Sequence, residues 1–74
     1  PKTRLQEWLQ ARQIALPVYE LSKVSGKAHR QVFEVSCSVD GYESITTGHG
    51  STRRNAEQQA AERMLAELAA ADAR

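Results

Sequence analysis

The residue types best suited to chemistry lie between Gly48 and Ala56, where the sequence reads Gly-His-Gly-Ser-Thr-Arg-Arg-Asn-Ala. Thr52 is a good helix N-cap, since its hydroxyl can accept a hydrogen bond from an amide two or three residues later. Arg53 and Arg54 then fall in the first helical turn, where the helix dipole disfavours cations by about 0.3–1 kcal/mol. Free amides, the dipole and two guanidinium groups together favour an anion, most obviously phosphate.

The glycines of this stretch shape its expected backbone. We interpret Gly48 and Gly50 as a loop that bends sharply and approaches a ligand closely, with Ser51 and Thr52 leading into the helix. The Gly-x-x-x-x-Gly-Lys-Ser/Thr spacing of a nucleotide-binding loop is absent, which argues against ATP or GTP. A helix start with two solvated arginines and no ligand is the alternative interpretation.

Length and composition limit the number of domains and the classes of protein to which this chain can belong. The 74 residues have room for one domain, and the single cysteine, Cys37, excludes a disulfide framework and a cysteine-rich zinc site. Neither an apolar run of membrane-spanning length nor a signal peptide is found, so we expect a cytoplasmic protein that does not contact a membrane. The chain starts at Pro1 instead of Met, and we expect a piece of a longer protein.

The charge is nearly balanced overall but unevenly distributed. The net charge is +1, yet residues 1–30 hold six Lys or Arg against two Glu, whereas residues 31–50 hold three acidic residues and neither Lys nor Arg. A local basic face is therefore compatible with the small net charge, and the local field is what attracts a polyanion.

Residues 1–13 have the pattern of an amphipathic helix. Leu5, Trp8 and Leu9 recur at helical spacing and form an apolar stripe. The opposite face carries mostly uncharged hydrogen-bonding groups: Thr3, Gln6, Glu7 and Gln10. Amides both donate and accept hydrogen bonds, which suits ribose hydroxyls and base edges. A plain solvated face is the alternative.

The rest of the chain predicts three strands and a second helix. Pro17 ends the helical region, and we expect strands at residues 18–24, 32–39 and 42–47, a polar turn at 25–30 and a tight turn at Asp40-Gly41. The closing helix, from Arg53 to about Ala71, places these apolar residues on one face: Ala56, Ala60, Ala61, Met64, Leu65 and Leu68. The predicted α+β fold is α-β-β-β-α, a three-stranded antiparallel sheet covered on one face by two helices, with Trp8, Tyr19 and Cys37 in the core.

Four segments, in this order and spacing, resemble the double-stranded RNA-binding domain, and in particular the C-terminal domain of bacterial ribonuclease III. They cover nearly the whole chain: residues 3–10, Pro17-Val18-Tyr19, Gly26-Lys27-Ala28-His29 and residues 48–56. Two residues depart from the family pattern. Lys27 stands where the family has a loop proline. Glu57 stands where the family's Gly-x-Gly-x-Ser-Lys-Lys-x-Ala-Lys block has its third lysine, which puts one usual phosphate contact in doubt.

The resemblance implies recognition of double-stranded RNA by shape, over about 16 base pairs. It places Thr3, Gln6, Glu7 and Gln10 in one minor groove and Gly26, Lys27, Ala28 and His29 in the next. The resemblance also implies that Ser51, Thr52, Arg53 and Arg54 contact the phosphates across the major groove. RNA should be preferred because duplex DNA lacks the 2′-hydroxyls and the groove width. An exposed loop histidine often has no function, which is the alternative for His29, and His49 has no assigned role.

We expect neither catalytic residues nor metal ligands here, since the sequence has no clustered carboxylates for two-metal hydrolysis and no nucleophile beside a base. The resemblance implies a longer endoribonuclease whose Mg²⁺ and acidic residues lie in another domain, which also forms a homodimer. This chain itself is expected to be monomeric and without a cofactor. Two alternatives remain open: the same fold used as a protein–protein interaction domain, or the RNA-binding module of a different RNA-processing protein.

Overall fold

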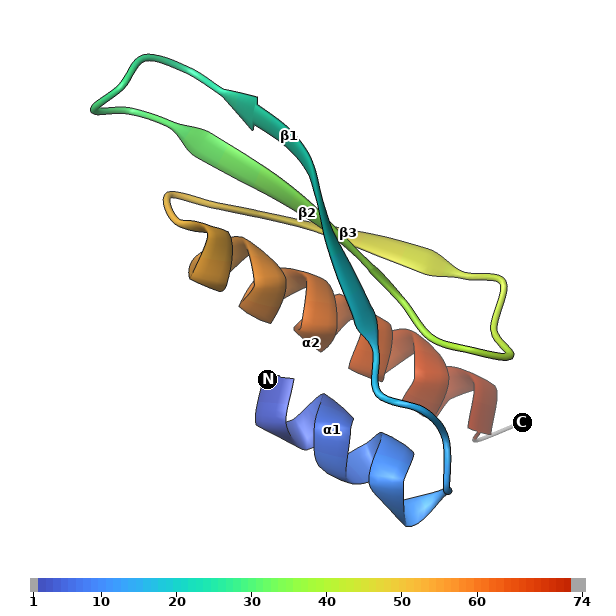
Figure 1. Ribbon diagram of the computed structural model, residues 1–74. Helices are drawn as coiled ribbons and strands as arrows, with labels where there is room; N and C mark the ends of the chain where they lie inside the picture. The colour runs from blue at the N-terminus through green and yellow to red at the C-terminus, as the bar shows by residue number, and fades with distance from the viewer. Residues whose placement is uncertain (1, 73–74) are drawn as a thin grey trace.

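The computed structural model describes residues 2–72 and has the predicted order of elements. Helix α1 spans Lys2–Ala11, strands β1, β2 and β3 span Val18–Ser25, Val32–Ser38 and Ile45–Gly50, and helix α2 spans Arg53–Asp72. The strands form one antiparallel sheet in the order β1-β2-β3. Both helices cover the same face of this sheet (Figure 1). The predicted α+β architecture is confirmed.

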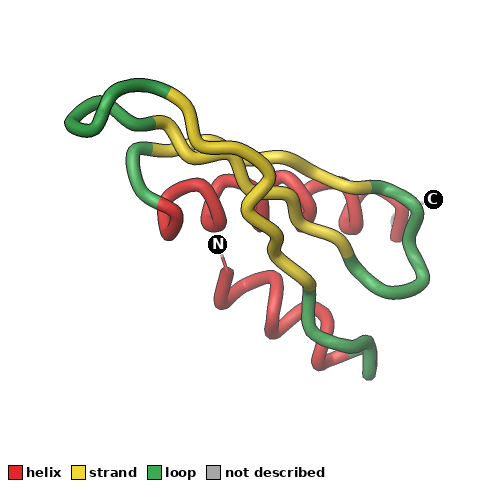
Figure 2. The backbone as a smooth tube through the Cα atoms, turned by 45° about the horizontal axis from the view of Figure 1, so that its top comes forward, coloured by secondary structure: helices red, strands yellow, loops and turns green. Residues whose placement is uncertain are grey.

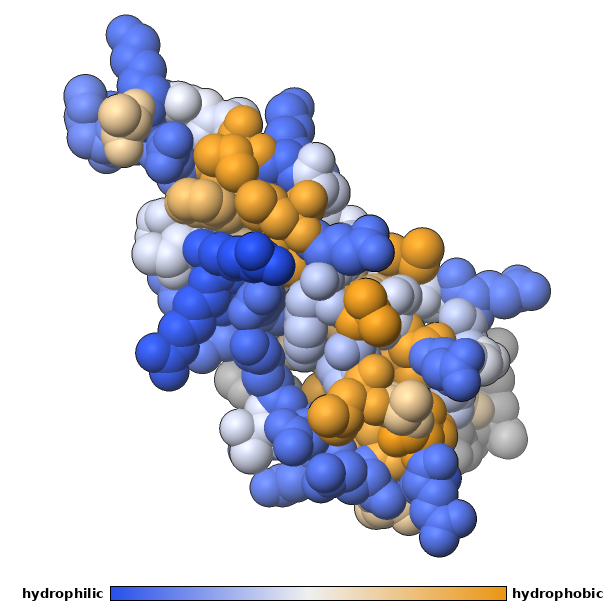
Figure 3. All heavy atoms as spheres, viewed as in Figure 1, coloured by the Kyte–Doolittle hydropathy of each residue, from blue (hydrophilic) through white to orange (hydrophobic). Residues whose placement is uncertain are grey.

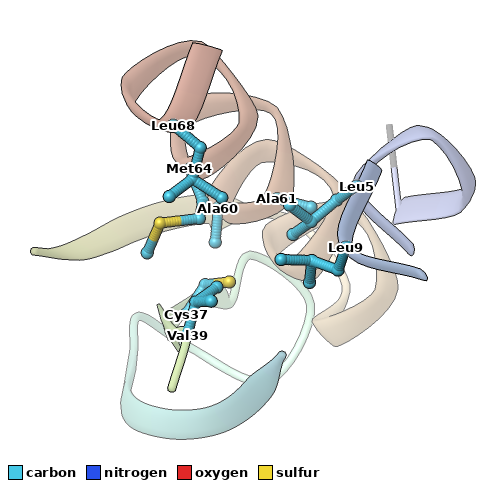
Figure 4. Close-up of a cluster of buried hydrophobic side chains, with 8 residues drawn as sticks. All are labelled: Leu5, Leu9, Cys37, Val39, Ala60, Ala61, Met64 and Leu68. Atoms are coloured by element: carbon cyan, nitrogen blue, oxygen red, sulfur yellow. The ribbon is translucent and has the colours of Figure 1, made fainter. Parts of the chain in front are cut away.

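The core lies between α1, α2 and the middle of the sheet (Figure 4). It consists of fully or almost fully buried side chains from both helices and from β2 and its end: Leu5, Leu9, Cys37, Val39, Ala60, Ala61, Met64 and Leu68. Trp8 and Tyr19 pack against this cluster and are partly buried, as predicted. Burial raises the pKa of the Cys37 thiol to about 11, so it stays protonated at neutral pH and acts as a small apolar residue.

Helix α1 ends two residues before the predicted Gln13 because the chain forms a Schellman motif there. Gln13 adopts a left-handed conformation with φ 57°. The Ile14 amide donates to the Leu9 carbonyl at 2.9 Å and the Gln13 amide to the Gln10 carbonyl at 3.1 Å, which satisfies two carbonyls at the helix end. A glycine commonly occupies this position, and its absence here removed the usual sequence signal.

The third strand was predicted three residues too early. The Asp40-Gly41 turn does form, with Gly41 at φ 86° and a 3.1 Å hydrogen bond from the Tyr42 amide to the Val39 carbonyl. It is only part of a longer connection, since β3 begins at Ile45, which pairs with Ser38 of β2. Pairing in this register turns Thr46 toward the helices, where its hydroxyl donates to the Ala60 carbonyl at 2.8 Å.

Gly48 and Gly50 belong to β3, which corrects the prediction that they form a loop shaped for a ligand. A Cβ atom on Gly48 would overlap the Ala56 carbonyl oxygen and the Ala60 backbone nitrogen. A Cβ atom on Gly50 would lie 2.8 Å from the backbone nitrogen of Ala56. The glycines therefore let α2 lie directly on β3, and the expected close backbone approach is to the protein's own helix.

Candidate nucleic-acid interface

The start of α2 has the predicted N-cap. The Thr52 hydroxyl accepts a hydrogen bond from the Asn55 amide at 3.1 Å, and the Thr52 carbonyl accepts one from the Ala56 amide at 3.0 Å. Ser51 and Thr52 form the short link from β3, and both are exposed, as are Arg53 and Arg54. A capped helix end with two exposed guanidinium groups can hold an anion through charge and through backbone amides.

The polar side of α1 is open to solvent along its whole length. Leu5 and Leu9 are buried against α2 and the sheet, which turns the other side of the helix outward. The four predicted residues of that side are all exposed: Thr3, Gln6, Glu7 and Gln10. These side chains give hydroxyl, amide and carboxylate groups that are free to exchange hydrogen bonds with a ligand.

The β1–β2 connection projects beyond the helices as a hairpin tip (Figure 1). Gly26 has a φ of 91°, and a Cβ atom there would overlap the Arg30 carbonyl oxygen, so this position favours glycine. The tip is closed by a 2.8 Å hydrogen bond from the Arg30 amide to the Lys27 carbonyl. Lys27, Ala28 and His29 are exposed at this tip, so the Lys27 ammonium group and the His29 ring face solvent.

These three regions lie along one side of the molecule. In Figures 1 and 2 the β1–β2 tip, the start of α2 and the start of α1 follow one another down the same side. Hydrophilic residues gather where the two helices begin, whereas hydrophobic residues follow β1 and the segment before it (Figure 3). The fold thus brings three segments that are far apart in the sequence, the start of α1, the β1–β2 tip and the start of α2, to the same side of the domain (Figure 1).

Glu57 joins two of these regions. Its carboxylate lies 2.9 Å from Nζ of Lys2 in α1 and 3.3 Å from Nε of Arg53 in α2. Hydrogen bonding to Lys2, and more weakly to Arg53, holds the pKa of Glu57 below its ordinary value, so it is ionised at neutral pH. The Arg53–Glu57 pair has helical i,i+4 spacing and could have been read from the sequence. Nothing local in the sequence indicated Lys2, which lies 55 positions away from Glu57.

His49 lies between Gly48 and Gly50, which face α2, so its side chain is on the sheet face that the helices leave uncovered. Its Nε2 atom is 2.9 Å from Oε1 of Glu34, its cross-strand partner. Oε2 of Glu34 accepts a 2.9 Å hydrogen bond from the Ser22 hydroxyl of β1. The His49 amide donates to Oε1 of Gln59 at 2.6 Å. These contacts tie the three strands and α2 together, which gives His49 a structural position that sequence reasoning did not assign.

Two further properties bear on function. Within residues 2–72, no three histidine, cysteine, aspartate or glutamate side chains are grouped as a metal site requires. None of the helices in the described part combines the length and apolar character needed to cross a membrane.

Known proteins share both the sequence and the fold of this chain. Residues 1–68 match the family described as the double-stranded RNA binding motif. Ribonuclease 3 of Actinobacillus pleuropneumoniae serotype 3 is 53% identical over 68 residues, which are 92% of this chain and 30% of that protein. Ribonuclease 3 of Dechloromonas aromatica is 56% identical over 69 residues, 93% of this chain and 31% of that protein. The chain therefore spans about a third of the length of these relatives.

A solved structure shares the same fold. The structure of Arabidopsis HYL1, described with its implications for miRNA processing, superposes with a TM-score of 0.76 at 38% identity. The superposition covers 92% of this chain and 94% of that one.

Proposed function

From the premise that the chain belongs to the double-stranded RNA-binding motif family, we propose that it binds double-stranded RNA by shape, as the substrate-binding module of a ribonuclease III-like endoribonuclease. The observation that carries this proposal is the placement of three segments with exposed polar residues on one side of the fold: the start of α1, the β1–β2 tip and the start of α2 (Figures 1 and 2).

The chemistry of each region fits one part of an A-form duplex. The uncharged groups on α1, such as Gln6 and Gln10, suit 2′-hydroxyls and base edges in a shallow minor groove. The capped start of α2, with Arg53 and Arg54, suits the phosphates that border the major groove. The β1–β2 tip, with Lys27 and His29, is assigned to the next minor groove along the duplex.

Relatives named Ribonuclease 3 support the proposed parent enzyme, since they match nearly all of this chain over about 30% of their own length. In that parent, cleavage, Mg²⁺ binding and homodimerisation belong to residues outside this chain. The chain alone is a monomeric binding module that contributes affinity and no catalytic group, and we place the parent in the cytoplasm.

One observation favours a second function, contact with another protein. Apolar side chains that are about half exposed follow β1 and the segment before it: Leu16, Val18, Leu21 and Val24, with exposed fractions between 42% and 54%. β1 is an edge strand, and exposed apolar edge strands are prone to pair with other chains. This surface lies along β1, so a protein contact there leaves the α1 face open.

Fluorescence anisotropy with labelled nucleic acids tests the proposed function. The chain is titrated into a duplex RNA of about 20 base pairs, long enough for a site of about 16, then into the matching duplex DNA and one RNA strand, each at two salt concentrations. We expect preference for duplex RNA and a modest loss of affinity with salt, because few phosphates are contacted. Equal binding to all three, or none, would contradict the proposal and favour the protein-contact function.

A further inference from the structure

Glu57 stands at the phosphate-binding end of the domain, where a negative charge should weaken binding to a polyanion. Its side chain is nevertheless well covered, with 16% exposure, between a more open Lys2 at 40% and Arg53 at 55%. Both cations direct a nitrogen at the same carboxylate. A carboxylate that is mostly covered and bonded to cations from two helices restricts the positions of those cations.

The contact to Arg53 is made through one particular nitrogen. Glu57 takes Nε of Arg53 at 3.3 Å, and among residues 2–72 the two terminal guanidinium nitrogens of Arg53 have no hydrogen-bonding partner. A guanidinium group is planar and rigid, so holding Nε fixes the direction of the other two nitrogens. Those two nitrogens form the fork that binds a phosphate through two parallel hydrogen bonds.

The contact to Lys2 fixes the start of α1. Nζ of Lys2 lies 2.9 Å from Glu57 and 5.2 Å from the centre of the Tyr19 ring, which adds a cation–π contact to the ion pair. Lys2 directly precedes Thr3, the first residue of the exposed polar face of α1. Glu57 thereby ties the face that meets the minor groove to the arginines that meet the phosphates.

We propose that Glu57 is a positioning residue for RNA binding, which holds the Arg53 fork and the start of α1 in the arrangement that a duplex requires. This inference rests on the proposed function, because it concerns the same surface. On this proposal, Glu57 in place of the family's third lysine loses one direct phosphate contact, but it holds Arg53 and the start of α1 in place.

The direction in which one substitution changes the affinity for RNA distinguishes a positioning role from simple repulsion. Glu57→Gln has nearly the same size but removes one negative charge, which raises the net charge of the chain from +1 to +2. If Glu57 only repels phosphate, this variant binds duplex RNA more tightly and with a steeper salt dependence. If Glu57 positions its neighbours, the variant binds more weakly in spite of its additional positive charge.

The experiment measures the affinity of the chain for the duplex RNA of about 20 base pairs, by anisotropy at two salt concentrations. We expect Glu57→Gln to weaken binding by about three- to tenfold, which lies in the lower part of the range of measured couplings between contacting residues. The matched control is Glu62→Gln, the same charge change on the exposed side of α2, and it should leave affinity unchanged or slightly higher. Urea unfolding of each variant confirms that it is folded at the assay temperature.

A double-mutant cycle identifies the residue through which Glu57 acts. Arg53→Ala is measured alone and in combination with Glu57→Gln, and we expect its effect on RNA affinity to shrink at least twofold in the combined variant. An independent variant, Arg53→Lys, keeps the charge but loses the fork, and it should also weaken binding several-fold. A purely structural role for Glu57 would change unfolding without any coupling to Arg53 in RNA affinity.

The outcomes separate this inference from the proposed function. Tighter or unchanged binding of Glu57→Gln, or full affinity of Arg53→Lys, would overturn the positioning role while the unmodified chain still binds RNA. Failure of the unmodified chain to bind duplex RNA would overturn the proposed function and this inference together.

Discussion

Gly48 of β3 lies against the backbone of Ala60 in α2 so closely that there is no room for a Cβ atom between them. Helix α2 carries alanine at both facing positions, Ala56 and Ala60, and both are fully buried. The distance between the sheet and this helix is therefore set by backbone contact. Because α2 also carries Arg53 and Arg54 at its start, this contact positions the proposed phosphate site relative to the sheet.

Substituting Gly48 with alanine should destabilise the fold severely. The added methyl group meets backbone atoms of α2, which cannot move without shifting the helix, and overpacking of this kind costs about 1–3 kcal/mol or more. Urea unfolding measures the loss. Gly41→Ala is the comparison, since Gly41 has no atom within 4 Å of an added Cβ and only its φ of 86° opposes the change, at about 1 kcal/mol. Equal losses for the two variants would show that α2 can move away from β3.

Substituting Arg54 with alanine should weaken binding to RNA duplexes of any sequence. Arg54 is exposed at the capped helix start, and the proposed interface assigns it a phosphate contact, so its loss should lower the salt dependence by about one unit of slope as well as the affinity. Lys23→Ala is the matched control, because Lys23 is an exposed cation opposite Glu34 in the sheet and is not among the predicted contact residues. Anisotropy at several salt concentrations checks both. If the two variants lose affinity equally, binding reflects total charge instead of a site.

Substituting Gln6 with alanine should reduce selectivity more than it reduces phosphate binding. Loss of one hydrogen bond from the exposed α1 face costs about 1 kcal/mol, and only RNA has the 2′-hydroxyl that this face is proposed to recognise. The ratio of affinities for matched RNA and DNA duplexes should therefore fall by about fivefold. Arg54→Ala serves as the contrast, since both duplexes have phosphates. An unchanged ratio for Gln6→Ala would remove the minor-groove role of α1.

The sequence predicted those features that depend on local periodicity. Leu5 and Leu9 at helical spacing identified α1 and its buried side, and the alternation of Val35 and Cys37 with serines identified β2. Thr52 was correctly identified as an N-cap, because a cap is made within four residues of sequence. Local interactions determine these elements, so a single sequence was enough to find them.

Features that depend on distant contacts were missed or misread. Gly48 and Gly50 looked like a flexible loop because glycine loosens a backbone, whereas here they make room for a helix that begins a few residues later. The ion pair of Lys2 with Glu57 joins opposite ends of the chain, and the contact of His49 with Glu34 depends on strand register. Packing and register are properties of the assembled sheet and helices, and no local pattern encodes them.

Acid should weaken the fold partly through Glu34. Hydrogen bonds from His49, and then from Ser22, lower the pKa of Glu34 below its ordinary value of 4.5. A carboxyl with a lowered pKa in the folded state stabilises the protein above its unfolded-state pKa, and this contribution is lost as pH falls through the folded-state value. The melting temperature of Glu34→Gln should therefore fall less than that of the unmodified chain between pH 5 and pH 3.

The control for this pH dependence is Glu20→Gln. Glu20 is also exposed on β1, and among residues 2–72 its carboxylate has no hydrogen-bonding partner. Glu20→Gln should therefore show the same fall in melting temperature between pH 5 and pH 3 as the unmodified chain. If Glu34→Gln follows the unmodified chain through the whole pH range, the three-strand contact contributes nothing to stability.

Removing the Tyr19 hydroxyl should leave the fold as stable as before or more stable. This oxygen is buried, and within the described residues it lacks a hydrogen-bonding partner of good geometry; its neighbour is the Cys37 thiol, a weak donor and acceptor. Burial raises the pKa of Tyr19 above its ordinary value, in keeping with a hydroxyl removed from water.

Tyr19→Phe keeps the ring that packs on the core and lies under Lys2, and removes only the oxygen. An unsatisfied buried polar group costs about 1–3 kcal/mol, so urea unfolding should show a gain within that range or no change. Tyr42→Phe, at a residue with 38% exposure, is the control and should be neutral. A loss greater than about 1 kcal/mol, the worth of a typical hydrogen bond, would mean that the Tyr19 hydroxyl is bonded in solution, to Cys37 or to a buried water.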